Sequence, residues 1–179
     1  MAILPIIKAP HPLLKQISRP VRDDEFGPEL RKRCEDMAET MYAAPGVGLA
    51  AIQVGDARRF VVVDPREEDD DGVRKSDGLR FMVNPSILSC SDVMMTWEEG
   101  CLSVPEFWED LVRPEWAVLS YTTADGEPVE ERFDGFSAVI VQHELDHLDG
   151  IIILDRVSRL KRSRYLKKVA KGRVQSDVP

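Results

Sequence analysis

Residues 135–149 constrain the fold most, because a helix over them would be apolar almost all the way round and would have to be buried. Gly150 follows where a helix commonly ends. Two of the three histidines, His143 and His147, lie four residues apart within this segment. That spacing puts both imidazoles on one helix face, where they can bind a single metal ion. Glu144, between them, is placed to act on a water molecule at the metal rather than on the metal itself, as in metal-assisted hydrolysis.

The alternative is that both histidines are ordinary core residues of a packed helix. The only other histidine in the chain is His11, near the N-terminus. In a chain so poor in histidine, two at this spacing around a glutamate favour a metal site.

Length and composition predict one domain over residues 1–179 with a sizeable core, since 43% of the residues are hydrophobic; with the hydrolytic pattern above, we expect a single catalytic domain. No apolar run approaches a membrane span, and the N-terminal segment lacks the features of a secretory signal, so we expect a cytoplasmic protein. The cysteines are odd in number and widely spaced, which favours free thiols or a metal ligand over a disulfide framework. They are Cys34, Cys90 and Cys101.

Charge is unevenly distributed along the chain. Residues 156–179, the basic tail, carry nine Lys or Arg and one acid, Asp177, so the tail has a net charge of +8 and the rest of the chain −16. The tail is either a solvated helix end or a docking surface for an anionic partner.

The hydrophobic patterns predict an α+β fold, with mostly antiparallel sheets packed around the buried, metal-binding helix. An N-terminal helix is expected at 28–42 and a C-terminal helix in the basic tail from about 156. Residues 65–78 have the composition of an exposed acidic loop, to which we assign no function. The predicted strands are 58–64, 80–83, 87–90, 93–97, 117–123 and 128–133. The apolar residues expected on the C-terminal helix are Val157, Leu160, Leu166 and Val169.

Residues 46–55 (GVGLAAIQVG) are too rich in glycine and alanine for an ordinary strand and too apolar for a surface loop. Small residues let a backbone approach another group closely. A phosphate-binding loop is disfavoured, because no Lys-Ser or Lys-Thr follows and no G-x-G-x-x-G lies between a strand and a helix.

A hydrolytic zinc-type site usually has a third protein ligand. The extended pattern H-E-x-x-H-x-x-G-x-x-H would place it at Ile153, which cannot bind a metal, and no glutamate occurs further downstream. The ligand is therefore expected upstream, where His11, carboxylates and cysteines are available. Cys101, within EEGCLS, offers the softest donor, whereas Cys34 and Cys90 are expected in the core. This chemistry alone leaves the choice open.

Three motifs occur in order along the chain: GVGLAAIQ, EEGCLS and QHELDHLDG. Together they closely resemble the motifs of the peptide deformylases, G-x-G-x-A-A-x-Q, E-G-C-x-S and H-E-x-x-H, and the resemblance covers most of the chain. It implies an α+β fold and a metal ion held by Cys101, His143 and His147. It also implies removal of the formyl group from the N-terminal formyl-methionine of new chains. In that family ferrous iron is the usual metal, and Zn²⁺, Ni²⁺ or Co²⁺ can occupy the site.

The resemblance also implies roles that suit the chemistry of particular residues. Glu144 would take a proton from the water at the metal and return it to the leaving amine. The Gln53 side-chain amide and the Leu102 backbone N–H would stabilise the oxyanion. Gly48 would leave room for the substrate backbone. The methionine side chain would enter a pocket lined by Val47, Phe136, Val139 and Ile140, each of which could equally be a core residue.

The expected partners are N-formylmethionyl nascent peptides and, through the basic tail, ribosomal RNA, since some bacterial relatives dock near the exit tunnel through a C-terminal helix. No membrane partner is expected. The chain departs from common family patterns at Ile52 and at Glu106-Phe107-Trp108, and by resemblance the latter borders the peptide groove, so it bears on substrate preference. Two alternatives stay open: an ordinary metallopeptidase, and a non-catalytic relative that binds nascent chains or ribosomes.

Overall fold

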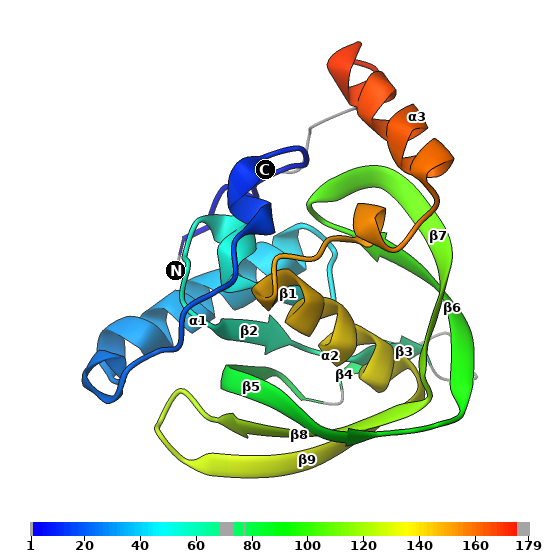
Figure 1. The fold of residues 1–179 in the computed structure, drawn as a ribbon. Helices are drawn as coiled ribbons and strands as arrows, with labels where there is room; N and C mark the ends of the chain where they lie inside the picture. The colour runs from blue at the N-terminus through cyan, green and yellow to red at the C-terminus, as the bar shows by residue number, and fades with distance from the viewer. Residues whose placement is uncertain (1, 69–73, 77, 175–179) are drawn as a thin grey trace.

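Two helices cover opposite faces of one antiparallel sheet in the computed structural model, which describes residues 2–68, 74–76 and 78–174 (Figure 1). The sheet has five strands in the order β1-β2-β5-β8-β9. These strands are β1 (Gly48–Ala50), β2 (Phe60–Val63), β5 (Arg80–Cys90), β8 (Trp116–Thr122) and β9 (Pro128–Asp134). The helices are α1 (Pro28–Ala43) and α2 (Gly135–Leu148). This arrangement confirms the predicted α+β class and the antiparallel pairing.

Strand β2 shows why the sheet is covered on both sides. All four of its residues are buried and apolar, as expected of a strand between two helices. Phe60 and Val62 belong to the core cluster that α1 completes, whereas Val61 and Val63 belong to the cluster that α2 completes. Because successive side chains of a strand point to opposite faces, α1 and α2 lie on opposite sides of β2.

Helix α2 is buried over most of its surface, with ten of its fourteen residues buried. It ends at Leu148, and Gly150 follows with a φ of 72°, the left-handed conformation that commonly terminates a helix. The Gly150 N–H donates to the His147 carbonyl at 3.1 Å. A side chain at position 150 would lie 2.6 Å from the Lys15 carbonyl oxygen, so this glycine also lets the N-terminal segment pack against the helix end.

A second, two-stranded sheet consists of β6 (Met94–Cys101) and β7 (Val104–Pro114). The sequence predicted only the first part of β6 and none of β7. Buried and exposed residues alternate along β7, and several of the exposed ones are charged, so its apolar content was too low to indicate a strand. Strand β5 is also continuous over 80–90, where two separate strands were predicted.

Two further predictions were wrong. The stretch 65–78 is not simply a loop, because β3 (Arg66–Glu68) pairs with β4 (Arg74–Ser76); residues 69–73 and 77 lie outside the described residues. Cys34 is fully buried as expected, but Cys90 is exposed. Cys90 is the last residue of β5, and the last five residues of this strand are all exposed. The strand therefore extends beyond the part of the sheet that the helices cover.

The basic tail contains the expected C-terminal helix, α3 (Arg159–Ala170); residues 175–179 lie outside the described part of the chain. Tyr165 attaches α3 to β7: its ring packs edge-on against Phe107 at 5.4 Å between centroids, and its hydroxyl donates to the Pro105 carbonyl at 3.1 Å. Leu160 was expected to pack but is 60% exposed, because the helix contacts the body around Tyr165 instead. Val157, Leu166 and Val169 pack against the same cluster. None of the described helices is long and apolar enough to cross a bilayer.

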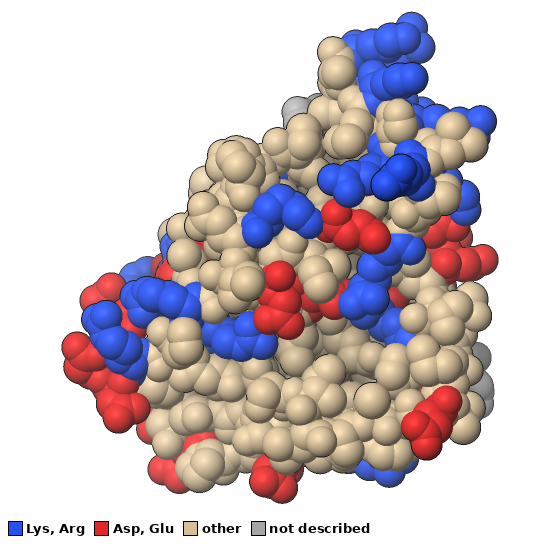
Figure 2. Space-filling model, viewed as in Figure 1, with Lys and Arg blue, Asp and Glu red and all other residues tan. Residues whose placement is uncertain are grey.

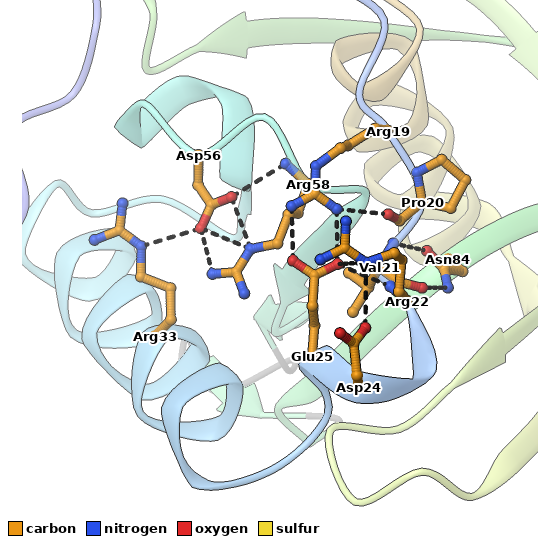
Figure 3. Close-up of polar contacts among 10 residues, drawn as sticks. All are labelled: Arg19, Pro20, Val21, Arg22, Asp24, Glu25, Arg33, Asp56, Arg58 and Asn84. Atoms are coloured by element: carbon orange, nitrogen blue, oxygen red, sulfur yellow. Dashed lines mark hydrogen bonds and ion pairs between the residues drawn. The ribbon is translucent and has the colours of Figure 1, made fainter.

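Polar contacts hold the loop before β2 against α1 and the N-terminal segment (Figure 3). Asp56 accepts a hydrogen bond from Arg58 at 2.7 Å, and Arg33 of α1 lies 3.6 Å from the same carboxylate. Arg19 donates through its backbone N–H to the carbonyl of residue 57 at 2.8 Å and pairs with Glu25 at 2.6 Å. The loop is therefore fixed from two sides.

Candidate metal centre

The structure brings together the three residues predicted as metal ligands. Helix α2 carries His143 and His147, whose ring centroids lie 5.0 Å apart, and β6 ends at Cys101. The possible ligand atoms of the three residues all lie within 4.8 Å of one another. Cys101 Sγ and His147 Nε2 lie 3.2 Å apart. One sulfur and two imidazole nitrogens at this separation suit a borderline divalent transition-metal ion.

Glu99 orients His143 from the side away from the other donors. His143 Nδ1 lies 2.8 Å from Glu99 Oε2, and both side chains are buried. With a carboxylate as acceptor, the hydrogen is on Nδ1, which leaves Nε2 free to bind a metal. Arg113 donates to both oxygens of Glu99, at 2.5 and 2.9 Å, and to Asp146 at 3.0 Å. The carboxylate is thus fixed as well as charged.

Burial and neighbouring groups shift the pKa values of the two histidines in opposite directions. Burial lowers the pKa of His143, but hydrogen bonds to Cys101 and Glu99 outweigh it and raise that pKa well above its usual value. Burial, together with the positive charges of His143 and Arg113, holds the pKa of His147 well below its usual value.

Glu144 lies beside the donors with one oxygen unsatisfied. Its side chain is buried, and its Oε2 atom has no hydrogen-bond partner among the described residues. Burial raises the pKa of Glu144 to about 7. A β-carbon added to Gly48 would lie 2.4 Å from Glu144 Oε1, so the glycine leaves room for this carboxylate. That role for Gly48 was not predicted from the sequence.

Gln53 projects from the short helix η3 (Ala51–Val54) toward Cys101. Its Oε1 accepts a hydrogen bond from the Ala50 N–H at 2.7 Å, which fixes the amide orientation. Its Nε2 lies 3.0 Å from Ser103 Oγ and 3.9 Å from Cys101 Sγ. Gln53 is only 2% exposed, and its donor group therefore faces the site from a rigid position.

Leu102 lies in the turn that joins β6 to β7, directly after Cys101. Lys8 donates to the Leu102 carbonyl at 2.9 Å, and the neighbouring Ser103 carbonyl accepts from the Ala9 N–H at 2.8 Å. The Ile7 N–H donates to the Gln53 carbonyl at 2.7 Å. The N-terminal segment thus holds both elements that carry the predicted oxyanion donors.

A cleft of about 760 Å³ opens above these residues. Every predicted site residue except His147 lines it. Phe136 stacks on Trp97, with centroids 5.2 Å apart, and forms one wall. Val139 and Ile140 are almost fully buried, so they present little surface to the cleft. Within the described residues, β1 pairs only with β2 and β6 only with β7, so the cleft lies between two strand edges that lack a second partner.

Sequence reasoning missed several residues that build the site. Glu99 and Ser103 lie within the EEGCLS motif, so they carried a signal that was not used. Lys8, Trp97 and Arg113 carried none, because each reaches the site only through folding.

A buried group of three donors, an unsatisfied carboxylate beside it and a cleft between two strand edges define a candidate metal-dependent hydrolase. The family model for polypeptide deformylase matches residues 3–163. The chain belongs to the polypeptide deformylase family.

Curated relatives and solved structures agree with this assignment. The chain is 50% identical over 171 residues to the peptide deformylase of Phenylobacterium zucineum, covering 96% of this chain and 97% of that protein. It is 44% identical to the peptide deformylase of Brucella suis, covering 96% and 94%. The crystal structure of peptide deformylase from Ehrlichia chaffeensis superposes with a TM-score of 0.89 at 35% identity, covering 96% of this chain and 97% of that one.

Proposed function

We propose that Cys101, His143 and His147 hold one divalent metal ion, at which this chain, as one catalytic domain, removes the N-formyl group of newly made polypeptides. Family membership gives the reaction class, since peptide deformylases are metal-dependent hydrolases. The observation that carries the residue assignment is the position of Glu144, whose buried Oε2 has no described partner and which lies next to donors within 4.8 Å of one another.

When bound, a divalent ion lowers the pKa of a water molecule toward neutrality and so supplies a nucleophile at physiological pH. Glu144 accepts the proton of the attacking water and returns it to the departing amine. The Gln53 amide and the Leu102 N–H donate hydrogen bonds to the former carbonyl oxygen of the formyl group as negative charge develops there. Glu99 keeps His143 in the tautomer that presents Nε2.

The cleft suits an extended peptide. A chain placed between the edges of β1 and β6 would extend both ladders, because each edge offers unpaired backbone groups. The methionine side chain would then point toward α2, into the pocket lined by Val47, Phe136, Val139 and Ile140. Gly48, which has no side chain, would leave room for the substrate backbone at the edge of β1. A related peptide deformylase from Acinetobacter baumannii, 39% identical with a TM-score of 0.82 and covering 87% of this chain and 99% of that one, is bound to Met-Ala-Ser.

The direct experiment is hydrolysis of formyl-Met-Ala-Ser by protein of measured metal content. We expect release of formate in proportion to metal occupancy and no cleavage of internal peptide bonds. Cleavage of an internal bond without deformylation would instead support the metallopeptidase alternative. Peptide binding without either reaction by metal-loaded protein would support a non-catalytic relative.

For the metal itself we propose Fe²⁺ in the cell, with Zn²⁺, Ni²⁺ or Co²⁺ able to substitute. The mixed sulfur and nitrogen donors accept all four ions, so selection would depend on availability rather than on geometry. Elemental analysis of protein purified without oxygen tests this, and predominant zinc in such a preparation would contradict it. Because its substrates would be nascent chains, we propose that the protein acts in the cytoplasm.

We also propose that the basic tail binds ribosomal RNA. Figure 2 shows Lys and Arg side chains gathered over α3, at the top of the view. Two of them are engaged, Lys161 with Glu109 and Arg162 with Asp155. The exposed basic residues with no ion pair in the described part of the chain are Arg159, Arg164, Lys167, Lys168, Lys171 and Arg173. Such charge binds phosphate and weakens as salt rises.

The test uses charge reversal rather than truncation, because Tyr165 attaches α3 to β7 beside the cleft. Replacing Lys167, Lys168 and Lys171 with Glu should reduce cosedimentation with ribosomes at low salt. A matched control reverses Arg22, Lys32 and Arg132, which are exposed elsewhere on the molecule. Equal loss in both variants would show that only net charge matters.

A further inference from the structure

The β6–β7 ribbon presents two different faces at the cleft. Directly paired residues of antiparallel strands point to the same face, and the face changes at every residue. Trp97 and Glu99 point toward α2, since they contact Phe136 and His143. The outer face carries two neighbouring cross-strand pairs, Gly100 with Trp108 and Glu98 with Asp110.

Trp108 is the most exposed of the large hydrophobic side chains that line the cleft. It is 66% exposed and lines the cleft, although an aromatic ring of this size is normally buried to a large extent. A β-carbon added to Gly100 would lie 2.8 Å from two atoms of the indole ring. The ring therefore lies directly over the glycine, one residue from Cys101, and keeps much of its surface open to solvent.

The position of Trp108 matches one residue of a bound peptide. If the peptide lies along the edge of β6 as proposed above, its side chains alternate between the two faces with a period of two. The methionine side chain points toward α2. The side chain of the next residue then points to the outer face, where Trp108 covers Gly100. This step rests on the proposed peptide-binding mode.

The outer face has the chemistry of a cation-binding surface. Glu98 and Asp110 are exposed, and neither has an ion-pair partner in the part of the chain that the structure describes. Among the described residues that line the cleft, Arg66 is the one Lys or Arg, and it donates to the Gly46 carbonyl. An indole face beside two carboxylates favours a long side chain with a positive end, because cation–π attraction and charge attraction act together.

We infer that Trp108, supported by Glu98 and Asp110, determines specificity for the residue after formyl-methionine, favouring Arg or Lys and disfavouring Asp or Glu. The metal-loaded enzyme should therefore hydrolyse formyl-Met-Arg-Ser with a kcat/KM about threefold to tenfold above that for formyl-Met-Ala-Ser. Formyl-Met-Glu-Ser should be slower than both. The differences should lie mainly in KM, because the contact is the same in the ground state and the transition state.

Three variants test the assignment on these peptides. Trp108→Ala should bring the Arg-to-Ala ratio to within about twofold of one, whereas Trp108→Phe, which keeps an aromatic face, should retain part of the preference. Glu98→Lys should reverse the order of the Arg and Glu peptides. Val112→Ala is the matched control, since Val112 lies on the same outer face of β7, is 59% exposed and does not line the cleft.

Added salt should shrink the wild-type preference, which a purely structural role of Trp108 would not explain. Equal kcat/KM values for the three peptides in the wild type, or a ratio unchanged in Trp108→Ala, would overturn the inference. Failure to hydrolyse any of the three peptides would overturn the proposed function instead, so the two failures are distinguishable.

Discussion

His143 Nδ1 lies 2.8 Å from Glu99 Oε2, and this contact connects a proposed metal ligand to a charge network behind it. Arg113 binds the same carboxylate and reaches Asp146, which also pairs with Arg156 at the root of the basic tail. The ligand is therefore oriented by charged side chains that are themselves held in place. Buried carboxylates that accept from a ligating histidine raise its basicity and fix its ring.

Glu99→Gln should weaken metal binding by about tenfold to a hundredfold, because an amide accepts less strongly from His143 and leaves Arg113 with less compensation. Competition with a chelator measures the affinity. Glu98→Gln is the control, since this neighbouring side chain is exposed on the other face of β6. An unchanged affinity in Glu99→Gln would mean that the contact does not support the ligand.

The three cysteines should differ sharply in reactivity. Burial raises the pKa of Cys34 to about 12, so its thiol stays protonated at pH 8, and burial also keeps a reagent from reaching it. Cys90 is exposed. Iodoacetamide should modify Cys90 quickly and Cys34 hardly at all. Removing the metal should make Cys101 reactive, because a coordinated sulfur is protected. Peptide mass mapping reads all three sites, and equal reactivity of Cys101 with and without metal would contradict its role as a ligand.

Asn84 should matter for stability rather than for catalysis. Its side chain accepts from the Val21 N–H at 2.8 Å and donates to the Val21 carbonyl at 2.9 Å, and its own φ is 52° (Figure 3). Asn84→Gly keeps the backbone conformation but loses both bonds, and we expect a loss of about 1–3 kcal/mol in the free energy of unfolding. Denaturant titration measures it. If kcat fell together with the free energy of unfolding, the metal centre would depend on the contact between Asn84 and Val21.

Strong local patterns explain which parts of the fold could be predicted. The continuous β-branched run around Val61 indicated a buried strand, and the almost wholly apolar segment around His143 indicated a buried helix; both elements formed where expected. Strand β7 has neither pattern. It is covered on one face only, and the apolar side chains Trp108 and Val112 lie on its exposed face, so apolar and polar residues do not alternate regularly along it. The sequence motifs identified the predicted metal ligands. The contact of Gly48 with Glu144 could not be predicted in this way, because it joins residues 96 positions apart and depends on how β1 packs on α2.

Gln53→Ala should lower kcat by about a hundredfold or more with a smaller effect on KM, because the amide donor acts mainly once the oxyanion forms. Ser103→Ala should cost less, since Ser103 Oγ only holds the Gln53 amide in place at 3.0 Å. Steady-state kinetics on formyl-Met-Ala-Ser separate the two constants. A change confined to KM in Gln53→Ala would mean that Gln53 is only a binding contact.

The central claim is that Cys101, His143 and His147 hold the ion while Glu144 moves the proton. The most direct test measures metal content and turnover of formyl-Met-Ala-Ser on the same preparation of Glu144→Gln. Because the carboxylate is not a ligand, occupancy should equal that of the wild type, while kcat should fall by about a hundredfold to ten-thousandfold. A fully loaded variant that turns over at the wild-type rate would contradict the account.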